Sequence, residues 1–317
     1  MQREIGGYIE FEYYSGSLFH EKSLKLNCAR NCLAYLIKAY DIKKIYIPYF
    51  LCDSVWKICK KYGVEFNFYH IDENFLPIIP DVNFSKDWLY VVNYYGQVSN
   101  DKIKVLSHYI NNLIVDNVQS FFQMPVNSIP TLYSCRKFFG VTDGAYLYTE
   151  KKLNEKILKD ISYKRMEFLF GRFEKTANEF YPQYVANNDL FENETIKEMS
   201  PLTENILRSL DYESIQNART ENFLYLNKHF QTINKLNLSI PKGAFAYPLY
   251  VENGSEIRKK LQKKRIYIPT LWADTFDVCK ENDLEYKYSK NILPLPLDQR
   301  YGKKEMNYIV NTFLEVF

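Results

Sequence analysis

Short apolar runs alternate with amphipathic segments along the first part of the chain. Four runs have the length and apolar content of buried strands, and they cover residues 44–48, 64–70, 88–93 and 113–115. The segments between them place apolar side chains three and four positions apart, as helices do, over residues 27–40, 53–62 and 99–110. Such alternation predicts a mainly parallel sheet covered by helices, an α/β fold.

The pattern is mostly helical after residue 150. A segment rich in Lys, Leu and Phe predicts a helix over residues 151–173, whereas a polar, acidic stretch predicts a loop over residues 181–196. We expect two further helices between residues 199 and 230, with a break near Asp211. Pro201 lies in a first-turn position, where a helix tolerates proline.

A smaller unit is expected from residue 236 onward. The pattern predicts a strand over residues 246–251, a helix that Ser255 caps, a strand over residues 266–269 and a closing helix over residues 304–317. We therefore expect three parts, which are an N-terminal segment of residues 1–26, a large domain of residues 27–235 and a small C-terminal α+β domain of residues 236–317.

The candidate chemistry lies in residues 113–148. Asp116 ends an apolar strand, and Lys137 follows a second short strand over residues 131–134. Ligands of open α/β sheets collect at such carboxyl ends. A carboxylate and an amine on neighbouring strand ends suit pyridoxal phosphate, whose pyridine nitrogen needs an acid and whose aldehyde bonds to a lysine. Gln119 lies one helical turn past Asp116, within reach of the same ring.

The order of Asp116, Gln119, Ser134 and Lys137, followed by a turn at Gly144, resembles the fold-type I pyridoxal-phosphate enzymes. Among them it resembles the DegT/DnrJ/EryC1/StrS sugar aminotransferases. The resemblance implies a three-layer aminotransferase fold of type I. It also implies that Asp116 holds the pyridine nitrogen, Gln119 contacts the ring hydroxyl, Ser134 binds the phosphate and Lys137 carries the cofactor.

Two details of the cofactor site stay open. The family binds the phosphate at the start of the first helix, where this chain has Ala29 and Arg30. Arg30 either adds a charged fork to the phosphate or is a plain surface arginine. The family also stacks an aromatic side chain on the cofactor ring. The matching position is Cys52, so Tyr49 or Phe50 would have to substitute.

The resemblance implies an aminotransferase acting on a nucleotide-linked keto sugar in surface-polysaccharide biosynthesis, with glutamate as the expected amino donor. A pyridoxal-phosphate-dependent dehydratase or lyase of the same fold, or a non-catalytic relative, are the alternatives. Fold-type I enzymes place the cofactor near a subunit interface. A homodimer is therefore expected, and residues 1–26 are the candidate for crossing between subunits.

Composition and charge restrict the kinds of partner that we expect for this protein. A net charge of +3 argues against binding nucleic acid through bulk charge. Six cysteines and four histidines show no zinc spacing, so we expect no metal site and free thiols in the cytoplasm. No apolar run reaches the length of about 18 residues that a membrane span needs. The basic run at residues 258–265 is either a solvated helix face or a basic nucleotide-sugar site.

Overall fold

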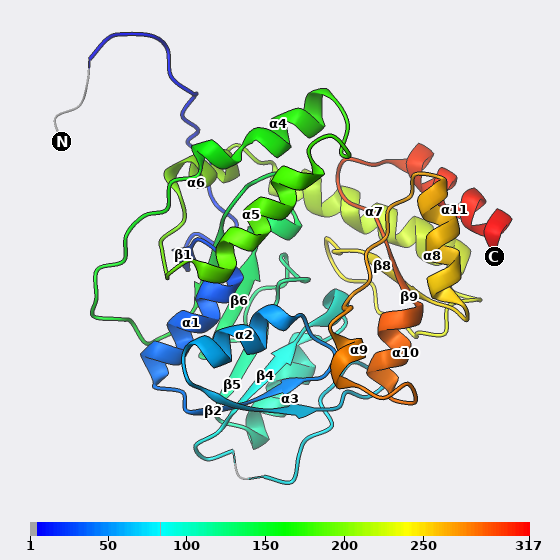
Figure 1. Ribbon diagram of the computed structural model, residues 1–317, viewed down its shortest axis with the longest axis horizontal. Helices are drawn as coiled ribbons and strands as arrows, with labels where there is room; N and C mark the ends of the chain where they lie inside the picture. The colour runs from blue at the N-terminus through cyan, green and yellow to red at the C-terminus, as the bar shows by residue number, and fades with distance from the viewer. Residues whose placement is uncertain (1–4, 83) are drawn as a thin grey trace.

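The computed structural model describes residues 5–82 and 84–317, and within them the main strands form a seven-stranded sheet (Figure 1). The strand order is β1-β7-β6-β5-β4-β2-β3. The strands are β1 Leu24–Leu26, β2 Lys44–Pro48, β3 Glu65–Tyr69, β4 Trp88–Val92, β5 Leu113–Asp116, β6 Thr131–Ser134 and β7 Ala145–Tyr148. All neighbouring pairs from β6 to β3 are parallel, and only the two pairs that include β7 are antiparallel. The predicted mainly parallel α/β sheet is confirmed.

The centre of the sheet is covered on both faces. Every residue of β4 and β5 is buried, as expected for central parallel strands under helices. The predicted helices are present as α1 Ala29–Tyr40, α2 Asp53–Lys61 and α3 Asn100–Tyr109. Asp53 is the first residue of α2 and not its cap, and it pairs with Lys57 one turn later at 2.7 Å.

The expected helix over residues 151–173 is wrong for its first half. Helical turns begin only at η3 Tyr163–Arg165 and continue as α4 Glu167–Glu174. Before them the chain is bonded to Glu198, because Asp160 N–H donates to the Glu198 carbonyl and Glu198 N–H donates to the Leu158 carbonyl, each at 2.9 Å. These long-range backbone bonds replace the bonds that a helix would make.

The loop expected at residues 181–196 is also wrong. This segment is mostly helix α5, Tyr181–Asn193, with a proline in its first turn. Its buried residues are Asn187 and Phe191, four positions apart on one face. Asn187 Nδ2 donates to the Thr142 carbonyl at 2.9 Å, which fixes α5 to the turn before β7. The two following helices, α6 Pro201–Arg208 and α7 Tyr212–Phe230, are present as predicted.

The C-terminal elements form a second, smaller layer beside the sheet, drawn from yellow to red in Figure 1. Its strands β8 Tyr247–Tyr250 and β9 Ile292–Leu295 pair antiparallel. Its helices are α8 Gly254–Lys263, α9 Thr275–Val278, α10 Leu284–Asn291 and α11 Lys303–Val316. The expected small α+β unit is thereby confirmed. Its core also includes Phe223, Leu226 and Phe230 of α7, and the boundary at residue 236 stays a prediction.

Three local expectations are corrected. Asn253, not Ser255, is the N-cap residue of α8. Residues 266–269 are not a strand. Ile266 and Ile268 are buried while Tyr267 is 52% exposed, so the alternation is real, but no neighbouring strand pairs with this segment in the described chain. Within the N-terminal segment, residues 24–26 form β1, whose pairing partner β7 lies far along the sequence.

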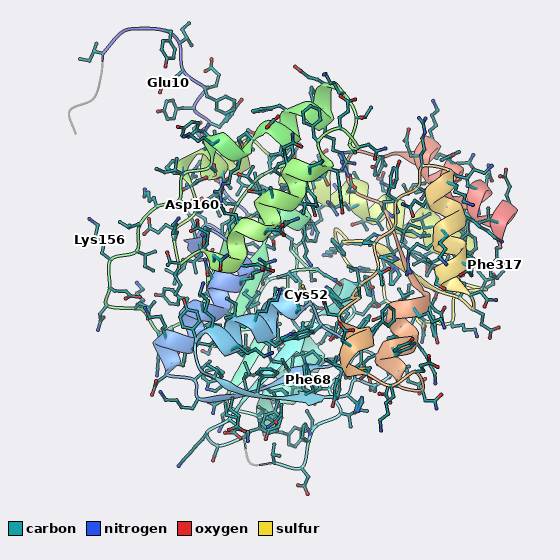
Figure 2. The ribbon with its side chains drawn as sticks, in the orientation of Figure 1. Glu10, Cys52, Phe68, Lys156, Asp160 and Phe317 are labelled. Carbon is teal, nitrogen blue, oxygen red and sulfur yellow. The ribbon has the colours of Figure 1, made fainter. Side chains whose placement is uncertain are left out.

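The N-terminal segment extends away from the body at its start, as Glu10 shows in Figure 2, and residues 5–17 are exposed. From residue 12 onward it is bonded to α6, because Asn205 donates to the Glu12 carbonyl at 2.7 Å and accepts the Tyr14 N–H at 2.9 Å. Leu18 and His20 are buried in an aromatic cluster. Residues 1–4 of the predicted segment lie outside the described residues. Among those described, no helix combines the length and apolar character needed to cross a membrane.

Candidate active site

Asp116 ends β5 at the edge of the sheet where the parallel strands terminate. Its side chain is only 4% exposed. Tyr90 of the neighbouring strand β4 donates its hydroxyl to Asp116 Oδ2 at 2.6 Å, and the backbone N–H of Val118 donates to Oδ1 at 2.8 Å. Burial raises the pKa of Asp116, and these two hydrogen bonds oppose that rise. Each carboxylate oxygen keeps a lone pair for a further donor.

Gln119 carries an unsatisfied donor near this carboxylate. Its Oε1 accepts the backbone N–H of Tyr95 at 2.9 Å, which fixes the orientation of the amide. Its Nε2 is buried and has no hydrogen-bond partner among the described residues. Burying an amide N–H without an acceptor costs about 1–3 kcal/mol. The geometry therefore leaves a donor ready for a ligand atom at this edge of the sheet.

Lys137 is the last residue of the short helix η2, Cys135–Lys137, which follows β6 directly. Desolvation by the surrounding protein lowers the pKa of Lys137, and the charge of Asp116 partly restores it. The side chain is nevertheless open to solvent. Its Nζ lies 5.6 Å from the ring centre of Phe245, a residue just before β8 of the C-terminal unit.

The turn after Lys137 is held tightly. Asp143 accepts the backbone N–H and the hydroxyl of Ser200, both at 2.8 Å, and also the hydroxyl of Thr203, which fixes the start of α6 against this turn. Gly144 has φ +109°, and a Cβ there would lie 3.0 Å from Thr203 Cγ2. The glycine of the predicted motif is thus required by both backbone conformation and space.

The start of α1 lies beside β6 and β7. No acidic residue lies in its first turn, and no side chain caps it. Ala29 and Arg30 are its first two residues, and Ser134 ends the adjacent strand β6, 8% exposed. A helix start of this kind favours an anion. The guanidinium of Arg30 donates from Nη1 to the Asn188 carbonyl of α5 at 3.2 Å.

The C-terminal unit also holds the backbone next to Lys137. Arg219 of α7 is 1% exposed, and it donates to the Phe138 carbonyl at 3.1 Å and to the Ala244 carbonyl at 2.9 Å. Gln299 donates to the same Phe138 carbonyl at 2.8 Å. Arg219 therefore fixes Phe138, which follows Lys137, and Ala244, which precedes Phe245.

Both aromatic candidates for ring stacking contact other aromatic rings of the protein. Tyr49 stacks on Phe68 with ring centres 4.8 Å apart. Phe50 is fully buried and packs against Tyr94 and Trp272. Cys52 is partly exposed, and its thiol group acts electrostatically to raise the pKa of Lys137. Figure 2 draws it in the middle of the molecule, between α2 and the C-terminal elements.

One group of possible metal ligands lies at this place in the described chain. It comprises Cys52, Asp53 and Asp274, whose ligand atoms lie within 4.8 Å of one another. Asp53 is already paired with Lys57. Asp274 Oδ2 accepts the backbone N–H of Asp53 at 3.1 Å. These contacts account for both carboxylates without an ion.

The residues present fit pyridoxal phosphate. Asp116 offers a buried carboxylate, Gln119 an unpaired amide donor and Lys137 an amine of lowered pKa, all at one edge of the sheet. The sequence had identified these three. It missed Tyr90, Phe245 and Arg219, because their contacts depend on strand register and on the C-terminal unit, which no local motif encodes.

Comparison with known proteins gives the same fold. No protein-family model and no curated protein matches the sequence. A DegT DnrJ EryC1 StrS aminotransferase from Brucella abortus superposes with a TM-score of 0.62, at 12% identity over 96% of this chain and 91% of its own. DesV of S. venezuelae, in complex with a ketimine intermediate, gives a TM-score of 0.64, at 13% identity over 96% and 90%.

A third similar structure is NtdA from Bacillus subtilis with bound cofactor PMP, the amino form of the cofactor. Its TM-score is 0.66, at 12% identity over 96% of this chain and 78% of its own. The predicted resemblance to the DegT/DnrJ/EryC1/StrS proteins is confirmed at the level of the fold. The chain has the three-layer fold of type I pyridoxal-phosphate enzymes, with the predicted acid and lysine at the ends of adjacent strands.

Proposed function

We propose that this protein is a pyridoxal-phosphate-dependent aminotransferase that acts on a sugar. The observation that carries the proposal is the buried Asp116 at the end of β5, electrostatically linked to Lys137 after the adjacent strand β6. Gln119 adds an unsatisfied donor at the same place. The solved structures with this fold include sugar aminotransferases, which supports the activity and the substrate class.

Each residue has a distinct task in this proposal. When bound, pyridoxal phosphate supplies an aldehyde and a pyridinium ring that withdraws electrons. Asp116 holds the proton on the ring nitrogen, since Tyr90 and Val118 keep its carboxylate oriented and ionised. Gln119 Nε2 donates to the ring hydroxyl. Ser134 and the first N–H groups of α1 bind the phosphate.

Lys137 serves as acid and base. Because burial lowers its pKa, a larger fraction of its amine is neutral near pH 7. A neutral amine would take a proton from the substrate carbon and, once protonated, would give it back at C4′ of the cofactor, on the other side of the nitrogen that joins the two. The Phe245 ring bounds one side of this amine, 5.6 Å from Nζ.

The finer assignment is also proposed. The substrate is a keto sugar linked to a nucleotide, the amino donor is glutamate, and the product enters surface-polysaccharide biosynthesis in the cytoplasm. The protein works as a homodimer with the site near the subunit interface. The likeness to solved sugar aminotransferases supports the sugar, while the remaining points follow from the resemblance of residues 113–148 to that family.

The amino-donor half-reaction tests the proposal. Purified protein loaded with pyridoxal phosphate is mixed with L-glutamate, and its absorbance spectrum and the 2-oxoglutarate formed are measured. We expect conversion to the pyridoxamine form with one 2-oxoglutarate per site, and no conversion in the Lys137→Ala variant. Bound cofactor that no amino acid converts would contradict transamination and favour a dehydratase or lyase.

A further inference from the structure

Two arginines at the candidate site point at the same residue of α5. Arg136, which directly precedes Lys137, donates from Nη2 to Asn188 Oδ1, and Arg30 donates from Nη1 to the Asn188 carbonyl. The Arg136 guanidinium also lies over the ring of Phe191, 4.7 Å from its centre. Asn188 and Phe191 therefore hold two cationic side chains at the start of α1.

Neither arginine has a carboxylate partner. No ion pair joins Arg30 or Arg136 to an acidic group of the described chain. The ionisable groups that act most strongly on Arg136 are Cys28, Tyr184 and the like charges of Arg30 and Arg165. Burial lowers the pKa of Arg136, the direction expected for a cation without a counter-charge. By contrast, Arg165 is paired with Asp160 at 2.7 Å.

Arg30 and Arg136 carry two positive charges that no carboxylate of the described chain offsets. The carboxylate of Asp116 acts instead on the amine of Lys137. The two arginines therefore leave an excess charge of +2 at the start of α1. A phosphate monoester carries about −1.5 to −2 at pH 7. One such group would neutralise the site, and a buried charge needs this compensation.

We propose that Arg30 and Arg136, oriented by Asn188 of α5, bind the phosphate dianion of the cofactor together with the start of α1. This assignment rests on the proposed function and deepens it. Guanidinium groups bind phosphate oxygens through paired N–H donors. Arg136 is bonded to Lys137, so a phosphate at Arg136 lies within the span of a small ligand attached to that lysine.

A phosphate of the substrate's nucleotide is the other source of the same chemistry. The comparison of pyridoxal phosphate with pyridoxal separates the two, because these ligands differ only in the phosphate. Dissociation constants are measured by absorbance titration for wild type, Arg136→Met and Arg30→Met. Arg165→Met is the matched control, since its guanidinium lies over the same Phe191 ring at 5.3 Å but has an acidic partner.

We expect wild type to bind pyridoxal phosphate more tightly than pyridoxal. Loss of either arginine should reduce that preference at least about tenfold, as for a charge-assisted contact. The Arg165→Met control should leave the preference unchanged. Circular dichroism melting confirms that each variant is folded, and Arg136→Lys, which keeps the charge but loses the fork, should fall between wild type and Arg136→Met.

Two outcomes overturn the assignment. If both ligands weaken equally in Arg136→Met, the arginine only holds α5 in place. If the preference is unchanged while affinity for uridine diphosphate falls, the pair binds the nucleotide of the substrate. Wild-type protein that binds neither pyridoxal phosphate nor pyridoxal would instead reject the proposed function, and this assignment would fall with it.

Discussion

Asp116 is a buried acid whose hydrogen bonds favour its charged form. Burial alone disfavours the carboxylate, and Tyr90, Val118 N–H and Lys137 act in the opposite direction. The sequence predicts Asp116 and Lys137 because Asp116 ends one apolar strand and Lys137 lies three residues after the end of the next. It could not predict Tyr90, which reaches Asp116 only because β4 and β5 pair with Val92 opposite Asp116.

Removing the Tyr90 hydroxyl should weaken the proposed role of Asp116, which is to keep the cofactor's ring nitrogen protonated. In Tyr90→Phe, Asp116 loses a hydrogen bond that lowers its pKa, so its pKa should rise further. We expect kcat to fall about tenfold, the effect of one hydrogen bond to a charged group, and the acid limb of the pH–rate profile to move to higher pH. Tyr133→Phe is the control, because that buried hydroxyl donates to the Gln123 carbonyl. A normal profile in Tyr90→Phe would contradict the role.

Individual elements show where sequence patterns fail. Helix α5 has only Asn187 and Phe191 buried, so its sequence carries almost no amphipathic signal, and Asn187 is buried by its hydrogen bond to the Thr142 carbonyl, far away in the sequence. Residues 266–269 carry a strand pattern, but no strand in the described part of the chain pairs with them. Conversely, α1, α2 and the central strands bury whole faces. Burial requires apolar residues at regular spacing on those faces, and this spacing predicts the elements from the sequence.

Arg219 links α7 to the loop that carries Lys137. In Arg219→Met, the Ala244 carbonyl loses its buried donor and the Phe138 carbonyl keeps only Gln299. We expect the free energy of unfolding to fall by about 3 kcal/mol or more. Urea unfolding measures this change. The exposed Arg300, paired with Asp298 at 2.6 Å, provides a control variant that should lose less than about 1 kcal/mol. Equal losses of unfolding free energy in the Arg219 and Arg300 variants would contradict this role of Arg219.

The N-terminal segment is held by a buried neutral histidine. His20 Nε2 donates to the Phe121 carbonyl at 2.8 Å, and its ring lies 4.1 Å from that of Tyr133. Burial lowers the pKa of His20 from 6.5 to about 4. The unfolded chain therefore binds a proton below pH 6.5 before the folded chain does. The stability that His20 provides is complete above pH 6.5 and is lost between pH 6.5 and 4.

His20→Phe isolates this effect because it keeps an aromatic ring but cannot be protonated. Between pH 7 and pH 4.5, wild type should lose about 2–3 kcal/mol more unfolding free energy than the variant. Urea titrations at both pH values measure the difference. Parallel pH dependence in the two proteins would show that His20 does not titrate as the structure implies.

The whole molecule brings two units together at one edge of the sheet. The C-terminal unit contacts the strand ends through Phe245 at Lys137, Glu285 at the Ile71 N–H and Ser239 at Gln97. The sequence predicts both units but not this docking, because each contact joins residues more than 100 positions apart.

A homodimer remains the prediction for the assembled protein. The exposed N-terminal segment carries Tyr8, Ile9 and Tyr13, which are 96%, 92% and 75% exposed. Apolar side chains this open favour burial against another surface. Multi-angle light scattering at micromolar concentration should give twice the chain mass of 37.8 kDa, and removal of residues 1–14 should weaken association. A monomer that turns over at wild-type rate would contradict the dimer.

The central claim is that Lys137 carries the cofactor. Protein loaded with pyridoxal phosphate is reduced with borohydride and digested, and the modified peptide is identified by mass spectrometry. We predict a single phosphopyridoxyl group on Lys137, and no modification in a folded Lys137→Ala variant. Modification of another lysine, or none in protein that has bound the cofactor, would contradict the account.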